Sequence, residues 1–175
     1  SSTSRGLGDV YKSQPIRISF GPLEGFYGTA GYQVDGGAPY GKKLSGYTYG
    51  WLEGYNMAGS VGDSKTNMLF AACNVFETQR SNHSWGIALP AGLYNVRLGL
   101  GARGPQDTVN VTLGQLRADG SKISIHDQIG AGEYKEYLLE KVELKDGGTV
   151  LSDVRLSLSS VNQTEIYFIE IDSLR

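Results

Sequence analysis

The chain has 175 residues, with 16 Lys and Arg against 18 Asp and Glu, and a formal net charge of −2. This length can bury one hydrophobic core but hardly two, so we expect a single domain. The balanced charge lacks the basic excess that nucleic acid or an anionic membrane surface requires, so we expect neither partner. The 25 Gly and 11 Tyr residues favour a turn-rich β protein that displays aromatic rings.

Apolar and polar residues alternate from Ile16 to the C-terminus, whereas the helical period is missing. We interpret residues 1–15 as an N-terminal tail or linker and residues 16–175 as one all-β domain. Many short strands in a domain of this size indicate an antiparallel β-sandwich of jelly-roll type. The predicted strands outside the central unit described below are Ile16–Phe20, Tyr47–Trp51, Met68–Ala72, Val109–Leu116, Lys122–Gln128, Lys135–Leu144, Val154–Leu158 and Glu165–Leu174.

The segment from Gly21 to Val61 breaks this strand rhythm, because Gly and Tyr dominate it. Loops of such length are uncommon in a compact domain unless they carry function, so we expect the functional site here. A sugar ring has apolar faces surrounded by hydroxyl groups, and its binding site pairs an aromatic platform with polar groups. Alternation in residues 47–51 also fits ordinary packing on one sheet face. The rings predicted to form the platform are Tyr27, Tyr32, Tyr47, Tyr49 and Trp51.

Polar side chains flank this aromatic segment and precede the next strand. Arg80 can fork onto vicinal hydroxyls or a uronic carboxylate, or it can be a solvated loop charge. If the rings of the Gly-rich segment do not bind ligand, we expect the platform on the concave sheet face. The predicted hydroxyl-reading groups are Asp63, Asn67, Arg80 and Asn82, with Asp35 and Asn56 as further candidates.

The most regular unit of the sequence runs from Trp85 to Leu100. Its two halves alternate, and Pro90-Ala91-Gly92 supplies a turn between them, so we predict a hairpin aimed at the core. Cys73 cannot form an internal disulfide, and its apolar neighbours predict that it is buried. The residues that we expect to point inward are Trp85, Ile87, Leu89, Tyr94, Val96, Leu98, Val111, Leu156, Tyr167, Ile169 and Ile171.

Four segments carry a family resemblance: residues 18–22, the Tyr49-Gly50-Trp51 triplet, the predicted hairpin and the closing strand Glu165–Ile171. In this order they resemble the galactose-binding-like β-sandwich domains, including malectin-like modules and the carbohydrate-binding modules attached to polysaccharide lyases and rhamnogalacturonan acetylesterases. The resemblance implies a jelly-roll that recognises an oligo- or polysaccharide through its loops. It also implies a linked catalytic or structural domain in a longer protein.

Many domains of this kind hold a structural calcium ion near the first and last strands. Carried over to this chain, the resemblance implies Glu24, Glu170 and Asp172 as its oxygen ligands. Because no dense Asp/Asn loop accompanies these residues, a domain that requires no cofactor is the favoured expectation.

We recognise no motif in the sequence that supplies a set of catalytic residues. Ser64 lies in Gly62-Asp63-Ser64, but His126 and Asp127 are neighbours on one strand and face opposite ways, which does not build a triad. We therefore predict a non-catalytic carbohydrate-binding module. Two alternatives stay open: a structural or protein-interaction sandwich of a multidomain or phage tail protein, and a small jelly-roll lyase or glycosidase that uses paired carboxylates.

The sequence also bears on where the protein acts. No apolar stretch has the length needed to span a bilayer, so we expect no membrane insertion. Asn-x-Ser/Thr tripeptides begin at Asn82, Asn110 and Asn162, and they weakly favour an exported protein. We expect a secreted or cell-surface location, with a virion as the alternative.

Overall fold

The computed structural model describes residues 14–22, 28–61, 68–76, 84–102, 108–130, 132–145, 155–160 and 163–174. A short 3-10 helix, η1 (Met68–Phe70), lies just before the sixth strand. In chain order the strands are β1 (Ile16–Phe20), β2 (Gln33–Asp35), β3 (Gly41–Lys42), β4 (Thr48–Trp51), β5 (Gly59–Val61), β6 (Ala72–Val75), β7 (Ser84–Ala88), β8 (Gly92–Ala102), β9 (Thr108–Arg117), β10 (Lys122–Gln128), β11 (Tyr134–Leu144), β12 (Arg155–Ser159) and β13 (Thr164–Leu174).

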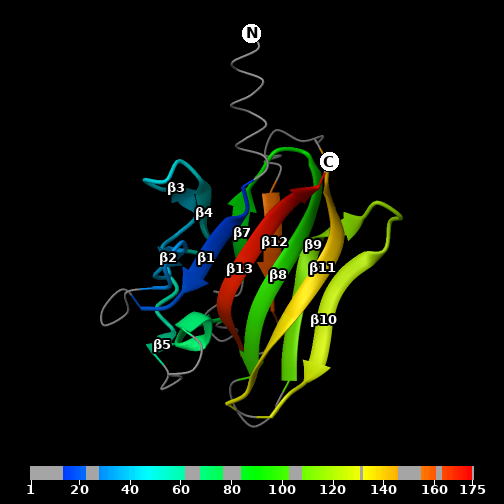
Figure 1. The fold of residues 1–175 in the computed structure, drawn as a ribbon. Coiled ribbons are helices and arrows are strands. Elements are labelled where there is room, and N and C mark those ends of the chain that lie inside the picture. The colour runs from blue at the N-terminus through cyan, green and yellow to red at the C-terminus, as the bar shows by residue number, and fades with distance from the viewer. Residues whose placement is uncertain are drawn as a thin grey trace.

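These strands form one curled sheet whose two halves pack face to face. The front half has the order β2-β1-β13-β8-β11 and the rear half β9-β12-β7-β4-β3, with β11 and β9 joined over two residue pairs. The described strands pair antiparallel, apart from β1 and β2, which are parallel. Figure 1 shows β1, β13, β8 and β11 side by side, with β7, β12 and β9 behind them. The chain is therefore an all-β sandwich of jelly-roll type, as its alternation predicts.

The main core lies between the two halves and contains apolar side chains from both. All eleven residues predicted to point inward are buried, and so is Cys73. Ten of the eleven belong to the main core, for example Leu98 on β8 and Ile169 on β13. Because one face of the longer strands meets this core, ten of the eleven residues that the period-2 pattern named lie in it.

The predicted hairpin between Trp85 and Leu100 is wrong, although both of its strands exist. β7 pairs with β12 and β4, whereas β8 pairs with β11 and β13. The connection around Pro90 therefore crosses from the rear half to the front half, and the Tyr94 hydroxyl donates to the Pro90 carbonyl over 2.6 Å. Both strands turn their apolar faces to the core, but they do so from opposite sides.

Tyr167 is buried, but it does not point into the main core. The pairing of β13 with β8 shifts by one residue between Ile166 and Phe168, which is a β-bulge with Tyr167 as the extra residue. After the bulge, Phe168 and Glu170 lie opposite Gly99 and Arg97. The bulge therefore places Tyr167 in a second cluster, on the outer face of the front half.

The predicted strand Met68–Ala72 is wrong in its first part. Residues Met68–Phe70 form η1, and the strand begins only at Ala72. Three consecutive apolar residues carry no alternation, so the pattern did not distinguish a strand from a tight turn. The turn lays the Phe70 ring beside Phe168, at a centroid distance of 5.6 Å.

Candidate functional site

The Gly-rich segment does not display its best predicted platform ring. Trp51 is 0% exposed, and its ring packs edge-to-face against Phe76 and Phe20 at 5.3 and 6.4 Å. Tyr49 is 4% exposed, and its hydroxyl lies 3.3 Å from Gln33 Oε1. The prediction that Trp51 stacks on a sugar is therefore wrong for this structure, because neither of its faces reaches the surface. The alternation in β4 reflects core packing.

A buried carboxylate explains why this segment turns inward. Asp35 Oδ2 accepts a hydrogen bond from Trp85 Nε1 and Oδ1 accepts one from the Gly37 amide, both over 2.8 Å. Burial raises the pKa of Asp35, while these two donors act in the opposite direction. The carboxylate thus attaches β2 to the central strand β7 and is not available to a ligand.

Close backbone packing accounts for some of the glycines in the same segment. Gly37 has φ +96°, and a Cβ there would lie 1.7 Å from the Asn56 carbonyl oxygen. Asn56 is itself buried and donates to the Val75 carbonyl over 2.7 Å. The glycines allow the chain to fold tightly onto the core, which is a different role from exposing aromatic rings.

Of the other predicted ligand-binding residues, the structure describes only Tyr47 and Tyr32. Tyr47 is partly buried and packs against the main core. Tyr32 lies on the opposite side of the front half, beside Phe168. The others, Glu24, Tyr27, Asp63, Asn67, Arg80 and Asn82, lie outside the described residues.

Five aromatic residues gather on the outer face of the front half, and we call them the outer aromatic cluster. They come from η1, β11, β13 and the chain just before β2, and the centroid distances between contacting rings run from 4.0 Å to 6.5 Å. The sequence analysis predicted one of them for the site. The members are Tyr32, Phe70, Tyr134, Tyr167 and Phe168.

Two glycines of β8 make room for this cluster. A Cβ on Gly99 would lie 2.4 Å from Phe168 Cε1, and a Cβ on Gly101 would lie 2.8 Å from Tyr167 Cε2. Both positions belong to the outer face, because Leu98 and Leu100 beside them point into the main core. Alternate glycines within a strand mark a close approach of other groups. The Gly-x-Gly pattern of Gly99 and Gly101 is the signal in the sequence that could have identified the cluster.

Tyr134 is the ring of this cluster that faces solvent most. It stacks on Phe70 with a centroid distance of 4.0 Å and an interplanar angle of 18°. Phe70 covers one face of the ring, and the residue remains 40% exposed. Leu138, four residues along β11 on the same face, is 52% exposed. A fixed, half-open ring beside an apolar side chain can support a flat ligand with an apolar face.

Charged groups cross the front half in a row beside the cluster. The register aligns Arg17 on β1, Glu170 on β13 and Arg97 on β8. Glu170 accepts a hydrogen bond from the Tyr32 hydroxyl and lies 3.6 Å from Arg97 Nη1. Burial and the nearby Glu170 raise the pKa of Tyr32. Tyr32 is therefore held as a neutral donor at the polar end of the cluster.

The calcium ion that the resemblance implies stays a prediction, because Glu24 lies outside the described residues. Glu170 already engages a phenol and a guanidinium, and Asp172 is exposed two residues further along β13. Within the described ranges, no three or more His, Cys, Asp or Glu side chains are grouped so that they could hold a metal ion.

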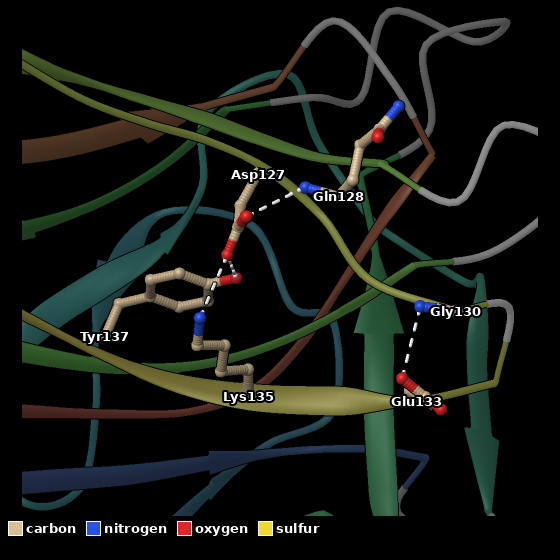
Figure 2. A network of polar contacts seen from close by, with 6 residues as sticks. All are labelled: Asp127, Gln128, Gly130, Glu133, Lys135 and Tyr137. Atoms are coloured by element: carbon tan, nitrogen blue, oxygen red, sulfur yellow. Dashed lines mark hydrogen bonds and ion pairs between the residues drawn. The ribbon is translucent and has the colours of Figure 1, made fainter.

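The other face of β11 carries a separate polar network (Figure 2). Asp127 Oδ2 accepts hydrogen bonds from the Tyr137 hydroxyl over 2.8 Å and from Lys135 Nζ over 3.2 Å. The Tyr137 and Lys135 donors lower the pKa of Asp127. Because Lys135 lies opposite Leu100 in the register, it points away from the face that carries Tyr134. Asp127 thus binds Tyr137 and Lys135, whereas His126 is exposed on the opposite side of β10.

Comparisons with known proteins place this fold among parts of larger chains. No protein-family model matches the sequence, and neither does any curated protein. The structure is similar to the protein YxiM of Bacillus subtilis, with a TM-score of 0.55 and 17% identity over 92% of this chain. It is also similar to a calcium-binding mutant of β-glucuronidase 2 and to a β-glucuronidase, both from Bacteroides uniformis.

These β-glucuronidase matches have TM-scores of 0.55 and 0.51, with 12% and 10% identity over 94% and 93% of this chain. The chain spans 40% of the YxiM chain and 18% of each β-glucuronidase chain. At these identities the likeness shows the fold, and it shows that sandwiches of this kind occur as parts of longer chains. Across the ranges that the structure describes, no helix is both long and apolar enough to cross a membrane.

Proposed function

We propose that this domain is a non-catalytic carbohydrate-binding module and that the outer face of β8 and β11 holds the glycan. The observation that carries the proposal is Tyr134, whose ring stacks on Phe70 and which is still 40% exposed. Sugar rings stack on such surfaces through their C–H faces, while nearby polar groups bind their hydroxyls. Arg97 and Glu136 are exposed on the same face and can serve as those groups.

Two further observations support this proposal. The solved structures that resemble the chain include two glycosidases, and the chain corresponds to a minor part of each. A binding module attached to a catalytic or structural domain of an exported protein would fit that pattern. The galactose-binding-like type that the sequence resembles belongs to the same proposal. Because each hydroxyl exchanges water for protein with a small net gain, we expect micromolar to millimolar affinity.

A glycan array of the purified domain tests the proposal, with Tyr134→Ala as the key variant. Removing a stacking ring should weaken binding by at least about 1 kcal/mol, roughly fivefold, while Tyr134→Phe should retain most of the signal. Tyr55→Ala is the matched control, because Tyr55 is a second exposed tyrosine, outside the outer aromatic cluster. Circular dichroism shows whether each variant is folded.

If Tyr134→Ala does not fold, Leu138→Ser probes the same face, because it replaces a side chain that is already half exposed. Unchanged glycan binding by both folded variants, or the absence of any glycan signal with the wild-type domain, would refute the proposal. In the second case, capture of a protein partner would favour the alternative of a structural or protein-interaction sandwich.

A further inference from the structure

The charges around Tyr134 restrict which glycans this face can take, and the argument rests on the function proposed above. The register places Val75, Glu165, Gly101 and Tyr134 in one row across the front half. The next row contains Ser19, Phe168, Gly99 and Glu136. These two rows therefore contain two carboxylates and, in the strands described, no Lys or Arg.

Glu136 has the clearest position among these acids. It lies two residues from Tyr134 and two from Leu138, so alternation directs all three side chains to the same face. Successive residues on one face of a strand are about 7 Å apart, which places the carboxylate within reach of a sugar ring that stacks on Tyr134. Glu136 is exposed, and no ion pair to it is found among the described residues.

The cation nearest in sequence does not neutralise these acids. Lys135 follows Tyr134 directly, but it lies on the other face of β11, where it pairs with Asp127 (Figure 2). Glu133, directly before Tyr134, is exposed and accepts a hydrogen bond from the Gly130 amide, and alternation directs its side chain to the face of Lys135 rather than that of Tyr134. On the face of Tyr134, these two rows therefore carry the exposed Glu136 and the buried Glu165, which accepts a hydrogen bond from the Cys73 thiol.

Positive charge on this face is found one row further along β11. Arg17 and Arg97 flank Glu170 there, and Arg97 lies opposite Leu138. Glu170 offsets part of this charge. Along β11, Glu136 therefore lies nearer than Arg97 to a sugar carboxylate that is held over Tyr134.

We propose that the face selects glycans without acidic groups and that Glu136 is the residue that determines this specificity. Its carboxylate accepts hydrogen bonds from the hydroxyls of a neutral sugar, or from the ammonium group of an amino sugar, and it repels a uronate or sulfate. At a separation of about 6 Å near a protein surface, this repulsion corresponds to roughly three- to tenfold weaker binding.

Matched glycan pairs on the array test this inference. The pairs share a backbone and differ in charge, for example methyl-esterified and free-acid oligogalacturonides, or neutral oligosaccharides and their sulfated forms. We expect wild-type binding that depends on Tyr134 to favour the neutral member at least threefold. Glu136→Gln should bring this ratio close to one, and Asp119→Asn, which removes the same charge in the β9–β10 turn, should leave it unchanged.

The possible failures are distinguishable. Absence of binding to any glycan refutes the proposed function and this inference together. If binding depends on Tyr134 but the acidic members bind equally well or better, the inference is wrong and the proposed function stands. A neutral preference that is the same in Glu136→Gln as in wild type also contradicts the role given to Glu136. Because exposed charges are screened, added salt should reduce the wild-type preference.

Discussion

The two outer-face glycines of β8 provide a test of the outer aromatic cluster that needs no ligand. A Cβ introduced by Gly99→Ala would lie 2.4 and 2.6 Å from two Phe168 ring atoms and 3.1 Å from Phe70 Cε1. Ordinary carbon contacts begin at about 3.5 Å, so the Phe168 ring must move by about 1 Å. Both rings are buried and cannot shift freely. We expect a loss of about 1–3 kcal/mol in the free energy of unfolding, the usual cost of overpacking.

Urea unfolding at equilibrium measures this loss, with Gly114→Ala as the control. A Cβ at Gly114 on β9 would lie 3.4 Å from Ser157 Cβ, which is close to ordinary contact. The control should be neutral or more stable by about 0.4–1 kcal/mol, because alanine restricts the unfolded chain. If Gly99→Ala is as stable as Gly114→Ala, then Phe168 and Phe70 do not pack on β8 as described. The packing of Phe70 beneath Tyr134 would then be contradicted as well.

The remaining predictions concern Asp35 and the bulge in β11, where the register with β8 shifts between Leu139 and Val142. Because burial raises the pKa of Asp35 above its usual 3.8, the folded state retains the proton more strongly, and this contribution to stability is lost as the pH rises above about 4. The difference in unfolding free energy between Asp35→Asn and wild type should therefore shift in favour of the variant from pH 4 to pH 7; an equal difference at both pH values contradicts this. Asn95 Oδ1 accepts a hydrogen bond of 3.1 Å from the amide of Lys141, which has φ 56°. Asn95→Ala should cost about 1 kcal/mol and speed hydrogen exchange at that amide, whereas an unchanged exchange rate argues against the contact.

The longer strands were predictable because each presents one face to the same core, whereas β2, β3 and β5 of the Gly-rich segment were not predicted. β1 and β10 match their predicted bounds, and β13 differs from its prediction by one residue. What alternation cannot show is which strand lies beside which. The segment around Pro90 connects two alternating strands in the way a hairpin would, but the partners of β7 and β8 lie in opposite halves of the sandwich.

The site was harder to predict than the fold, for two physical reasons. Aromatic residues in a Gly-rich segment are compatible with rings exposed to a ligand and also with rings packed into the core. The hydrogen bond between Asp35 and Trp85, which holds this segment against the core, joins residues 50 positions apart in sequence. On the outer face of the front half, the bulge in β13 adds one residue, so Tyr167 points away from the core that Ile169 and Ile171 enter. A period-2 pattern carries no information on such a bulge.

The most direct test of the account is to map the bound glycan on the domain by NMR. An oligosaccharide that binds on the array is titrated into isotopically labelled protein, and the aromatic and amide shifts are followed. The account predicts that the largest changes occur at the Tyr134 ring and at Glu136 and Leu138, with little change at Trp51 and Tyr49 in the core. Changes that concentrate elsewhere and leave the Tyr134 ring unaffected would show that the outer face of β8 and β11 is not the binding site.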